Sequence, residues 1–211
     1  PASNDPRSAE HAGNGFLFRR GYSFVWSAWQ ADLLPGDGRV VMDVPVATDN
    51  GAPITGPVRQ EFIPNRTTYC YPLSGRAGTR CHPTVSRDTS KAALTKRRYT
   101  NDPRQLIVPS DWQFSQVLSG DALTGEGGGG ETGIAPSDTH IYMPAGFQPG
   151  WIYELVYEAR DPLVLGLGHV AVRDLISFLK YADIDAAGNA NPLAGTEKAY
   201  GWGRSQTGRC I

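Results

Sequence analysis

Apolar residues near the C-terminal end of the chain recur with the spacing of an α-helix. Between His169 and Lys180 they lie three or four positions apart, which predicts an amphipathic helix. The apolar face consists of Val172, Leu175, Ile176 and Leu179. A helix with this pattern gains stability only by burying that face, so we expect it to pack against another element.

Shorter apolar runs predict buried strands. Residues 22–29 and 151–157 are rich in aromatic and β-branched side chains, which favour strands. A shorter run, 198–203, is also expected to be a strand. Residues 16–20 have the pattern of a helix end that is stopped by Gly21. A helix end followed by a buried strand is typical of an α/β fold.

The middle of the chain has a different pattern. Its apolar runs are bounded by loops rich in Gly, Pro, Ser and Thr, including Gly127–Gly130, and helical periodicity is weak. Strands are expected at residues 39–46, 57–63 and 139–143. We therefore expect residues 35–150 to form a β-rich insertion or cap with long loops.

This division predicts an α/β chain with two parts. Residues 1–34 and 151–211 are expected to belong to one core, and residues 35–150 interrupt it. The 211 residues are enough for one sizeable core with such an insertion.

The charges of the chain nearly cancel. There are 20 basic and 21 acidic residues, with a formal net charge of −1, so we expect no nucleic-acid partner and no binding to anionic membranes. The basic cluster Lys96–Arg98 is short and is expected to lie in a solvated loop. No apolar run approaches the roughly 20 residues that a membrane-spanning helix needs, so no span is expected.

The three cysteines leave the redox compartment open. Cys70 and Cys81 are close in the sequence, in a segment that could fold back as a loop closed by a disulfide. That disulfide would favour a secreted or extracytoplasmic protein, whereas two free thiols would not. Cys210 is expected to be a small buried residue. No His, Cys and Asp residues have the spacing of a metal site, and neither a metal nor another cofactor is expected.

One short motif carries candidate chemistry. In Gly203-Arg-Ser205 an expected strand ends at the serine, and helix-compatible residues follow at once. This order is typical of a nucleophile elbow, in which a strained turn presents the serine hydroxyl. The turn would place the backbone N–H of Gln206 in the oxyanion hole. The usual motif has glycine two residues after the serine, whereas Thr207 holds that position here and Gly208 follows it.

Three blocks of the sequence resemble the α/β-hydrolase domain-containing proteins. The blocks are residues 15–32, residues 152–168 with a continuation at 172–179, and residues 203–209. The resemblance implies the central portion of an α/β-hydrolase fold, with Ser205 as the catalytic nucleophile. It also implies a carboxylic ester hydrolase that forms an acyl-enzyme with small-molecule esters.

A serine hydrolase of this fold needs two further catalytic residues. In the α/β-hydrolase order the acid and the histidine follow the serine, so we expect both to be supplied from beyond Ile211. They would come from the remainder of the same polypeptide or from a second chain, and this fragment alone is expected to be inactive. Structural or solvated roles are expected for the four histidines before the serine, which are His11, His82, His140 and His169.

Two other functions fit parts of the sequence. Residues 163–171 match Gly-x-Gly-x-x-Ala at the start of a helix, a pattern of dinucleotide-dependent oxidoreductases. Dinucleotide binding also needs a second strand that ends in an acidic residue about 20 positions further along the chain. Asp183 and Asp185 lie near that distance, but in a turn-like segment. The other alternative is a non-catalytic binding protein on a hydrolase-like scaffold. Trp29 and Trp112 are candidates for the lining of a substrate pocket, with core packing as the alternative for each.

Overall fold

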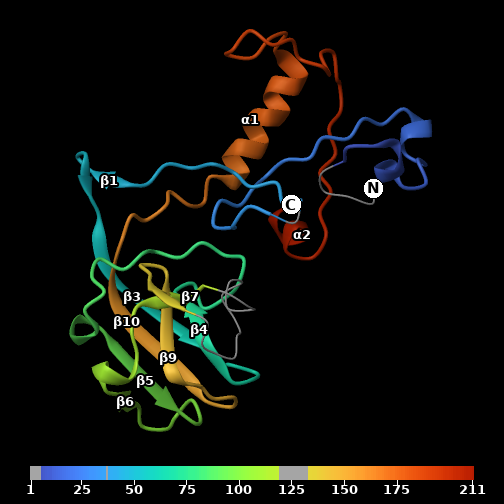
Figure 1. Ribbon diagram of the computed structural model, residues 1–211. Coiled ribbons are helices and arrows are strands. Elements are labelled where there is room, and N and C mark those ends of the chain that lie inside the picture. The colour runs from blue at the N-terminus through green and yellow to red at the C-terminus, as the bar shows by residue number, and fades with distance from the viewer. Residues whose placement is uncertain (1–5, 37, 119–132) are drawn as a thin grey trace. The chain divides into compact units, whose positions relative to one another are not determined.

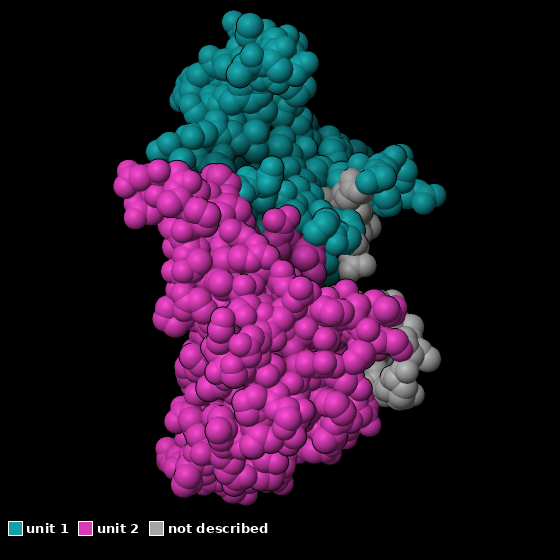
Figure 2. All heavy atoms as spheres, turned by 60° about the vertical axis from the view of Figure 1, so that its left-hand side comes forward, with its two compact units in different colours: residues 1–31, 35–44, 165–211 teal, residues 32–34, 45–164 magenta. Residues whose placement is uncertain are grey.

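The computed structural model describes residues 6–36, 38–118 and 133–211 (Figure 1). The chain forms two compact units, which Figure 2 shows in different colours. Unit 1 consists of residues 1–31, 35–44 and 165–211, and unit 2 consists of residues 32–34 and 45–164. The loop predicted at Gly127–Gly130 lies outside the described residues.

Unit 2 is built from antiparallel strands. Its largest sheet has four strands in the order β3-β10-β5-β6, and β4 pairs with β9, β7 with β8, and β1 with β2. The strands are β1 (Thr48–Asp49), β2 (Ala52–Pro53), β3 (Thr55–Phe62), β4 (Thr68–Pro72), β5 (Ala93–Arg97), β6 (Gln105–Ile107), β7 (Ser115–Val117), β8 (Ile134–Pro136), β9 (His140–Phe147) and β10 (Ile152–Arg160). Two 3₁₀ helices, η3 (Thr89–Lys91) and η4 (Pro109–Asp111), lie between them in the sequence.

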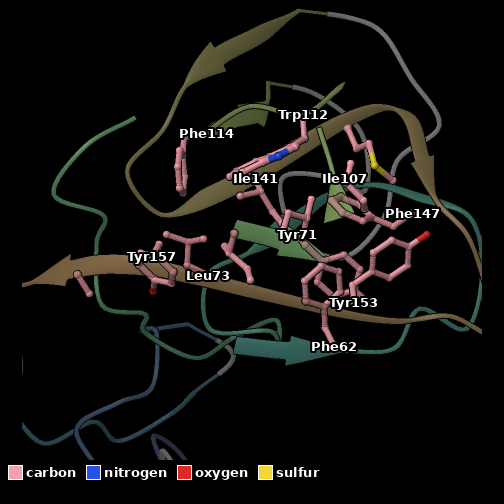
Figure 3. Close-up of a cluster of buried hydrophobic side chains, with 14 residues drawn as sticks. Phe62, Tyr71, Leu73, Ile107, Trp112, Phe114, Ile141, Phe147, Tyr153 and Tyr157 are labelled. Carbon is pink, nitrogen blue, oxygen red and sulfur yellow. The ribbon is translucent and has the colours of Figure 1, made fainter. Parts of the chain in front are cut away.

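A hydrophobic core lies between the sheets of unit 2 (Figure 3). Because alternate residues of a strand point to the same face, β10 contributes Tyr153, Leu155 and Tyr157 together. The ring of Phe147, from β9, meets the rings of Phe62 and Tyr153 edge-on, with centroids 5.2 and 5.1 Å apart. Aromatic contacts of this geometry join the β4–β9 pair to the four-stranded sheet.

The other face of the four-stranded sheet carries a network of charged side chains. Glu154 and Glu61 stand directly opposite each other on β10 and β3, and like charges in this position repel unless cations neutralise them. Arg104 donates to both carboxylate oxygens of Glu154, at 2.8 and 3.0 Å. Arg97 donates to Glu61 at 2.6 Å and to Glu154 at 3.3 Å. The hydrogen bonds from Arg104 and then Arg59 lower the pKa of Glu154 to about 2.

Replacing Glu154 by glutamine should destabilise unit 2 by about 3 kcal/mol at neutral pH, because Arg97 is nearly buried and loses one of its carboxylate partners. The pKa of Glu154 in the folded state lies below its ordinary value of 4.5. The stabilisation is therefore complete above 4.5 and is lost as the pH falls toward about 2. Urea denaturation over this pH range should show the difference between wild type and Glu154→Gln shrinking. Glu158→Gln, at an exposed position of the same strand, is the control, and an undiminished difference at the acid end would contradict the prediction.

Unit 1 contains the two α-helices and two of the 3₁₀ helices of the described residues. These are the α-helices α1 (Gly168–Tyr181) and α2 (Gln206–Cys210) and the 3₁₀ helices η1 (Ala9–Ala12) and η2 (Phe18–Arg20). The amphipathic helix predicted at 169–180 is confirmed as α1. The helix end predicted before Gly21 is confirmed as η2, and the φ of 83° at Gly21 is the left-handed conformation that ends a helix.

Few side chains of unit 1 are buried. Among its described residues only Ala31, Gly168 and Asn191 are. Large aromatic side chains remain in solvent, and Tyr200 and Trp202 are 72% and 77% exposed. The apolar surface buried within unit 1 therefore contributes little to its stability.

The predicted α/β-hydrolase fold is wrong. Every strand pair in the described parts of the chain is antiparallel, and those parts contain only two α-helices. The α/β-hydrolase core instead needs a largely parallel sheet covered by helices on both faces. Residues 22–29 and 198–203 were expected to be strands of that sheet, but neither forms a β-ladder with any described segment. In the run 39–46 only Val46 forms a bridge, to Leu163.

Three other strand predictions are confirmed. The strands expected at residues 57–63, 139–143 and 151–157 are β3, β9 and β10. β10 pairs with β3 and β5 in antiparallel register within unit 2. A run of aromatic and β-branched residues favours a strand, but it does not choose the neighbour of that strand.

Candidate active site around Ser205

Ser205 has a backbone conformation that few residues with a side chain adopt. It directly precedes α2, and its φ of 55° and ψ of −121° lie outside the regions open to most L-residues. Only two other non-glycine residues with positive φ occur in the described ranges, Asn50 and Asp161, and both are of types that tolerate it. The Ser205 side chain is exposed. The turn therefore holds a serine hydroxyl in solvent through a strained backbone.

Two glycines allow the chain to make this turn. A Cβ on Gly203 would lie 2.6 Å from the carbonyl carbon of Thr207, and a Cβ on Gly208 would lie 2.9 Å from the Gly203 oxygen. The segment before Ser205 thus passes in close contact with the first residues of α2. The close approach requires glycine at position 208 rather than 207, which accounts for the departure from the usual serine motif.

Replacing Gly203 by alanine should displace this turn, because the obstructing atoms belong to the backbone and cannot rotate away. We expect the reaction of Ser205 with a fluorophosphonate probe to slow by about tenfold or more, as small displacements of a nucleophile have such effects. Gly56→Ala is the matched control, since a Cβ there meets nothing within 4 Å. Equal labelling rates for the two variants would show that the contact does not hold the serine in place.

Trp29 links the starts of the two α-helices of unit 1. Its indole Nε1 donates to the hydroxyl of Thr207 at 3.4 Å. Its backbone oxygen lies 2.2 Å from where a Cβ of Gly168 would stand, so α1 can begin there only with glycine. Trp29 thus lies beside the helix that follows Ser205. Trp112, in contrast, is 3% exposed and belongs to the core of unit 2.

His11, His140 and His169 make their side-chain hydrogen bonds with residues other than Ser205. His169 lies in unit 1, and its Nδ1 is 4.0 Å from Sγ of Cys210, which is half-buried rather than buried. Cys210 follows Ser205 by five residues at the far end of α2, and five residues of a helix span about 7.5 Å. His11 accepts a hydrogen bond from the Arg7 backbone, and His140 contacts the Thr139 hydroxyl. Within the described residues, no hydrogen bond joins the Ser205 hydroxyl to a partner.

Gln206 is the first residue of α2. The N–H groups in the first turn of a helix have no acceptor within that helix. The Gln206 N–H therefore remains available to an acceptor bound beside Ser205, which is the position expected of an oxyanion donor.

Cys70 and Cys81 are free thiols rather than a disulfide. The Cys70 thiol donates to the Ser115 carbonyl at 3.8 Å, and the Cys81 thiol donates to the Thr139 carbonyl at 3.7 Å. Burial raises the pKa of each thiol to about 11, so both are protonated and weakly nucleophilic at neutral pH. The disulfide that would have favoured a secreted protein is not formed.

The fingerprint at residues 163–171 lacks the setting that dinucleotide binding requires. α1 does begin at Gly168, but Leu163 forms only an isolated antiparallel bridge and no strand leads into the helix. In the part of the chain that the structure covers, no parallel strand follows α1. The βαβ unit of a dinucleotide site is therefore not formed by these residues.

The described residues contain neither a metal-binding cluster nor a membrane-spanning helix. No group of three or more His, Cys, Asp or Glu side chains there could hold a metal ion. No helix in those ranges is both long and apolar enough to cross a membrane.

Comparisons with known proteins give no relative. No protein-family model, curated protein or solved structure matches this chain. The resemblance to α/β-hydrolase domain-containing proteins stays a prediction for the serine motif, while the fold that it implied is wrong.

Proposed function

We propose that Ser205 is the nucleophile of a serine ester hydrolase that acts on small carboxylic esters. The observation that carries the proposal is the Ser205 backbone, with φ of 55° and ψ of −121°. A serine keeps such a conformation only where its surroundings enforce it, and strained residues of this kind concentrate at active sites. The glycines at 203 and 208 provide that enforcement through their close contact.

The proposed reaction proceeds through an acyl-enzyme. Ser205 Oγ attacks the ester carbonyl carbon while a histidine takes its proton, and the Gln206 N–H donates to the oxyanion. The C–O bond to the alcohol breaks as the histidine returns the proton to the departing oxygen. Water, deprotonated by the same histidine, then attacks the acyl carbon. The bond from that carbon to Oγ breaks, and the histidine returns the proton to Oγ, which releases the acid and restores the Ser205 hydroxyl.

The proposal includes a source for the histidine and its acid outside the 211 residues. A serine hydroxyl is a weak nucleophile without a base, and no described residue is hydrogen-bonded to the Ser205 hydroxyl. The remainder of a longer polypeptide, or a second chain, would supply both groups. The exposure of Tyr200 and Trp202 beside the serine motif supports this arrangement, because further protein would cover such aromatic surface.

Fluorophosphonate labelling tests the proposal. The natural protein or complex that contains this chain should be labelled, and labelling should disappear in Ser205→Ala. The matched control is Ser27→Ala, which removes another exposed serine of unit 1 and should leave labelling intact. The isolated 211-residue chain should react poorly. Labelling that survives in Ser205→Ala would refute the nucleophile, and rapid labelling of the isolated chain at Ser205 would refute the external base.

A non-catalytic binding protein is the second candidate. The observation in its favour is that no described residue is hydrogen-bonded to the Ser205 hydroxyl. This alternative predicts that even the natural assembly does not react with the probe, so the same experiment separates the two functions.

A further inference from the structure

Unit 2 contains a cavity of about 250 Å³ that is independent of Ser205. Part of its lining comes from the inner face of the four-stranded sheet, where Val58 and Tyr157 stand directly opposite each other on β3 and β10. Leu73, which directly follows β4, adds a further buried apolar side chain. The remaining lining belongs to Gln60 of β3, to the loop of residues 74–82 and to Asp32.

Hydrogen bonds fix the loop that lines this cavity. The Arg80 N–H donates to the Asp32 carbonyl at 2.8 Å, and the Leu34 N–H donates to the Gly78 carbonyl at 2.9 Å. The Tyr157 hydroxyl donates to the His82 carbonyl at 2.8 Å, which joins the loop to the sheet. These hydrogen bonds hold the loop against the sheet, so the cavity is preformed, as ligand pockets usually are.

The charged side chains that line the cavity favour an anion. Arg76 and Arg80 are opposed by a single carboxylate, that of Asp32. Among the described residues, the Arg76 guanidinium has no hydrogen-bond or ion-pair partner, and Arg80 uses only Nε, which donates to the Leu33 carbonyl at 3.3 Å. Several guanidinium N–H groups are thus left to bind an acceptor, and carboxylates match their planar geometry.

We propose that this cavity binds a small organic monocarboxylate with an apolar body. The carboxylate would pair with Arg76 and Arg80, and the apolar body would contact Val58, Leu73 and Tyr157. One excess positive charge suits one carboxylate, and the volume lies just below the range of pockets for drug-sized ligands, which suits a body of about one ring. This site does not depend on the function proposed for Ser205.

Titration with benzoate tests the site in the full chain, followed by ¹⁵N–¹H NMR of backbone amides. Benzoate should give saturable shifts at residues 74–82, and benzyl alcohol, which has the ring without the charge, should bind at least about tenfold more weakly. The double variant Arg76→Gln/Arg80→Gln should lose about tenfold or more in benzoate affinity. Arg87→Gln, at an exposed arginine outside the cavity, should bind as wild type does.

Three results would overturn the proposal. They are the absence of saturable shifts in the loop, equal affinity for benzyl alcohol and benzoate, and an equal loss in the Arg87→Gln control. If the double variant does not keep the amide spectrum of the folded protein, each single arginine variant serves in its place. Shifts confined to surface residues outside the loop and the strands β3 and β10 would also count against the site.

Discussion

Replacing Ser205 by alanine should lower kcat/KM for a short-chain nitrophenyl ester by about 10⁴-fold or more in the natural assembly. Without the hydroxyl no acyl-enzyme can form, and only ester binding and oxyanion stabilisation remain. The loss should fall on kcat, because the side chain contributes to bond formation more than to substrate binding. Release of nitrophenolate, measured for both proteins over a range of ester concentrations, gives the two constants separately.

The kinetic controls separate catalysis from folding. Ser27→Ala should keep wild-type constants, and Ser205→Ala should keep the wild-type denaturation midpoint. A serine in a strained turn that served structure alone would give the opposite result, with altered stability and unchanged turnover. Ester hydrolysis that is equal in wild type and Ser205→Ala would remove the proposed reaction altogether.

Replacing Phe147 by alanine should destabilise unit 2 by about 4 kcal/mol, the range found for a fully buried phenylalanine. Phe147 is 0% exposed, and its ring contacts those of Phe62, Tyr71 and Tyr153. The truncation leaves a cavity between the sheets. Backbone hydrogen bonds hold the sheets in place, so the surrounding side chains cannot move in to fill it. Urea denaturation followed by tyrosine and tryptophan fluorescence measures the loss.

An exposed aromatic residue provides the comparison for Phe147. Tyr99 is also in unit 2 but is 69% exposed, so Tyr99→Ala should change the free energy of unfolding by less than about 0.5 kcal/mol. Similar losses in the two variants would show that the aromatic cluster does not carry the stability of unit 2.

A predicted strand formed only where a second segment of the chain was present to pair with it. Residues 57–63 and 151–157 became β3 and β10, whereas residues 22–29, which have more aromatic side chains than either, form no ladder with any described segment. The difference lies outside these segments, since β10 has partners on both edges. The expected α/β layers failed for this reason, because local composition does not report which strands meet or in which direction.

Parts of the candidate site could be anticipated and parts could not. The sequence pointed to Ser205, to a helix beginning at Gln206 and to a need for small residues around the serine. It could not show that Gly208 supplies the close approach while Thr207 contacts Trp29, because these contacts depend on how the chain crosses itself. The arginine-lined cavity gave no sequence signal either, since Asp32 and Arg80 are far apart in the chain.

Local residue order was enough to predict the strained serine turn and the amphipathic helix α1. Both depend on residue type and on neighbours within a few positions, which the order of residues specifies directly. Tertiary structure alone decided the antiparallel pairing of β10, the free state of Cys70 and Cys81, and the contact of His169 with Cys210. Those features require segments far apart in the chain to meet, and their meeting depends on the packing of the whole unit. Ser205 is therefore a nucleophile candidate from sequence, and the absence of a described hydrogen-bond partner for its hydroxyl is a finding of the structure.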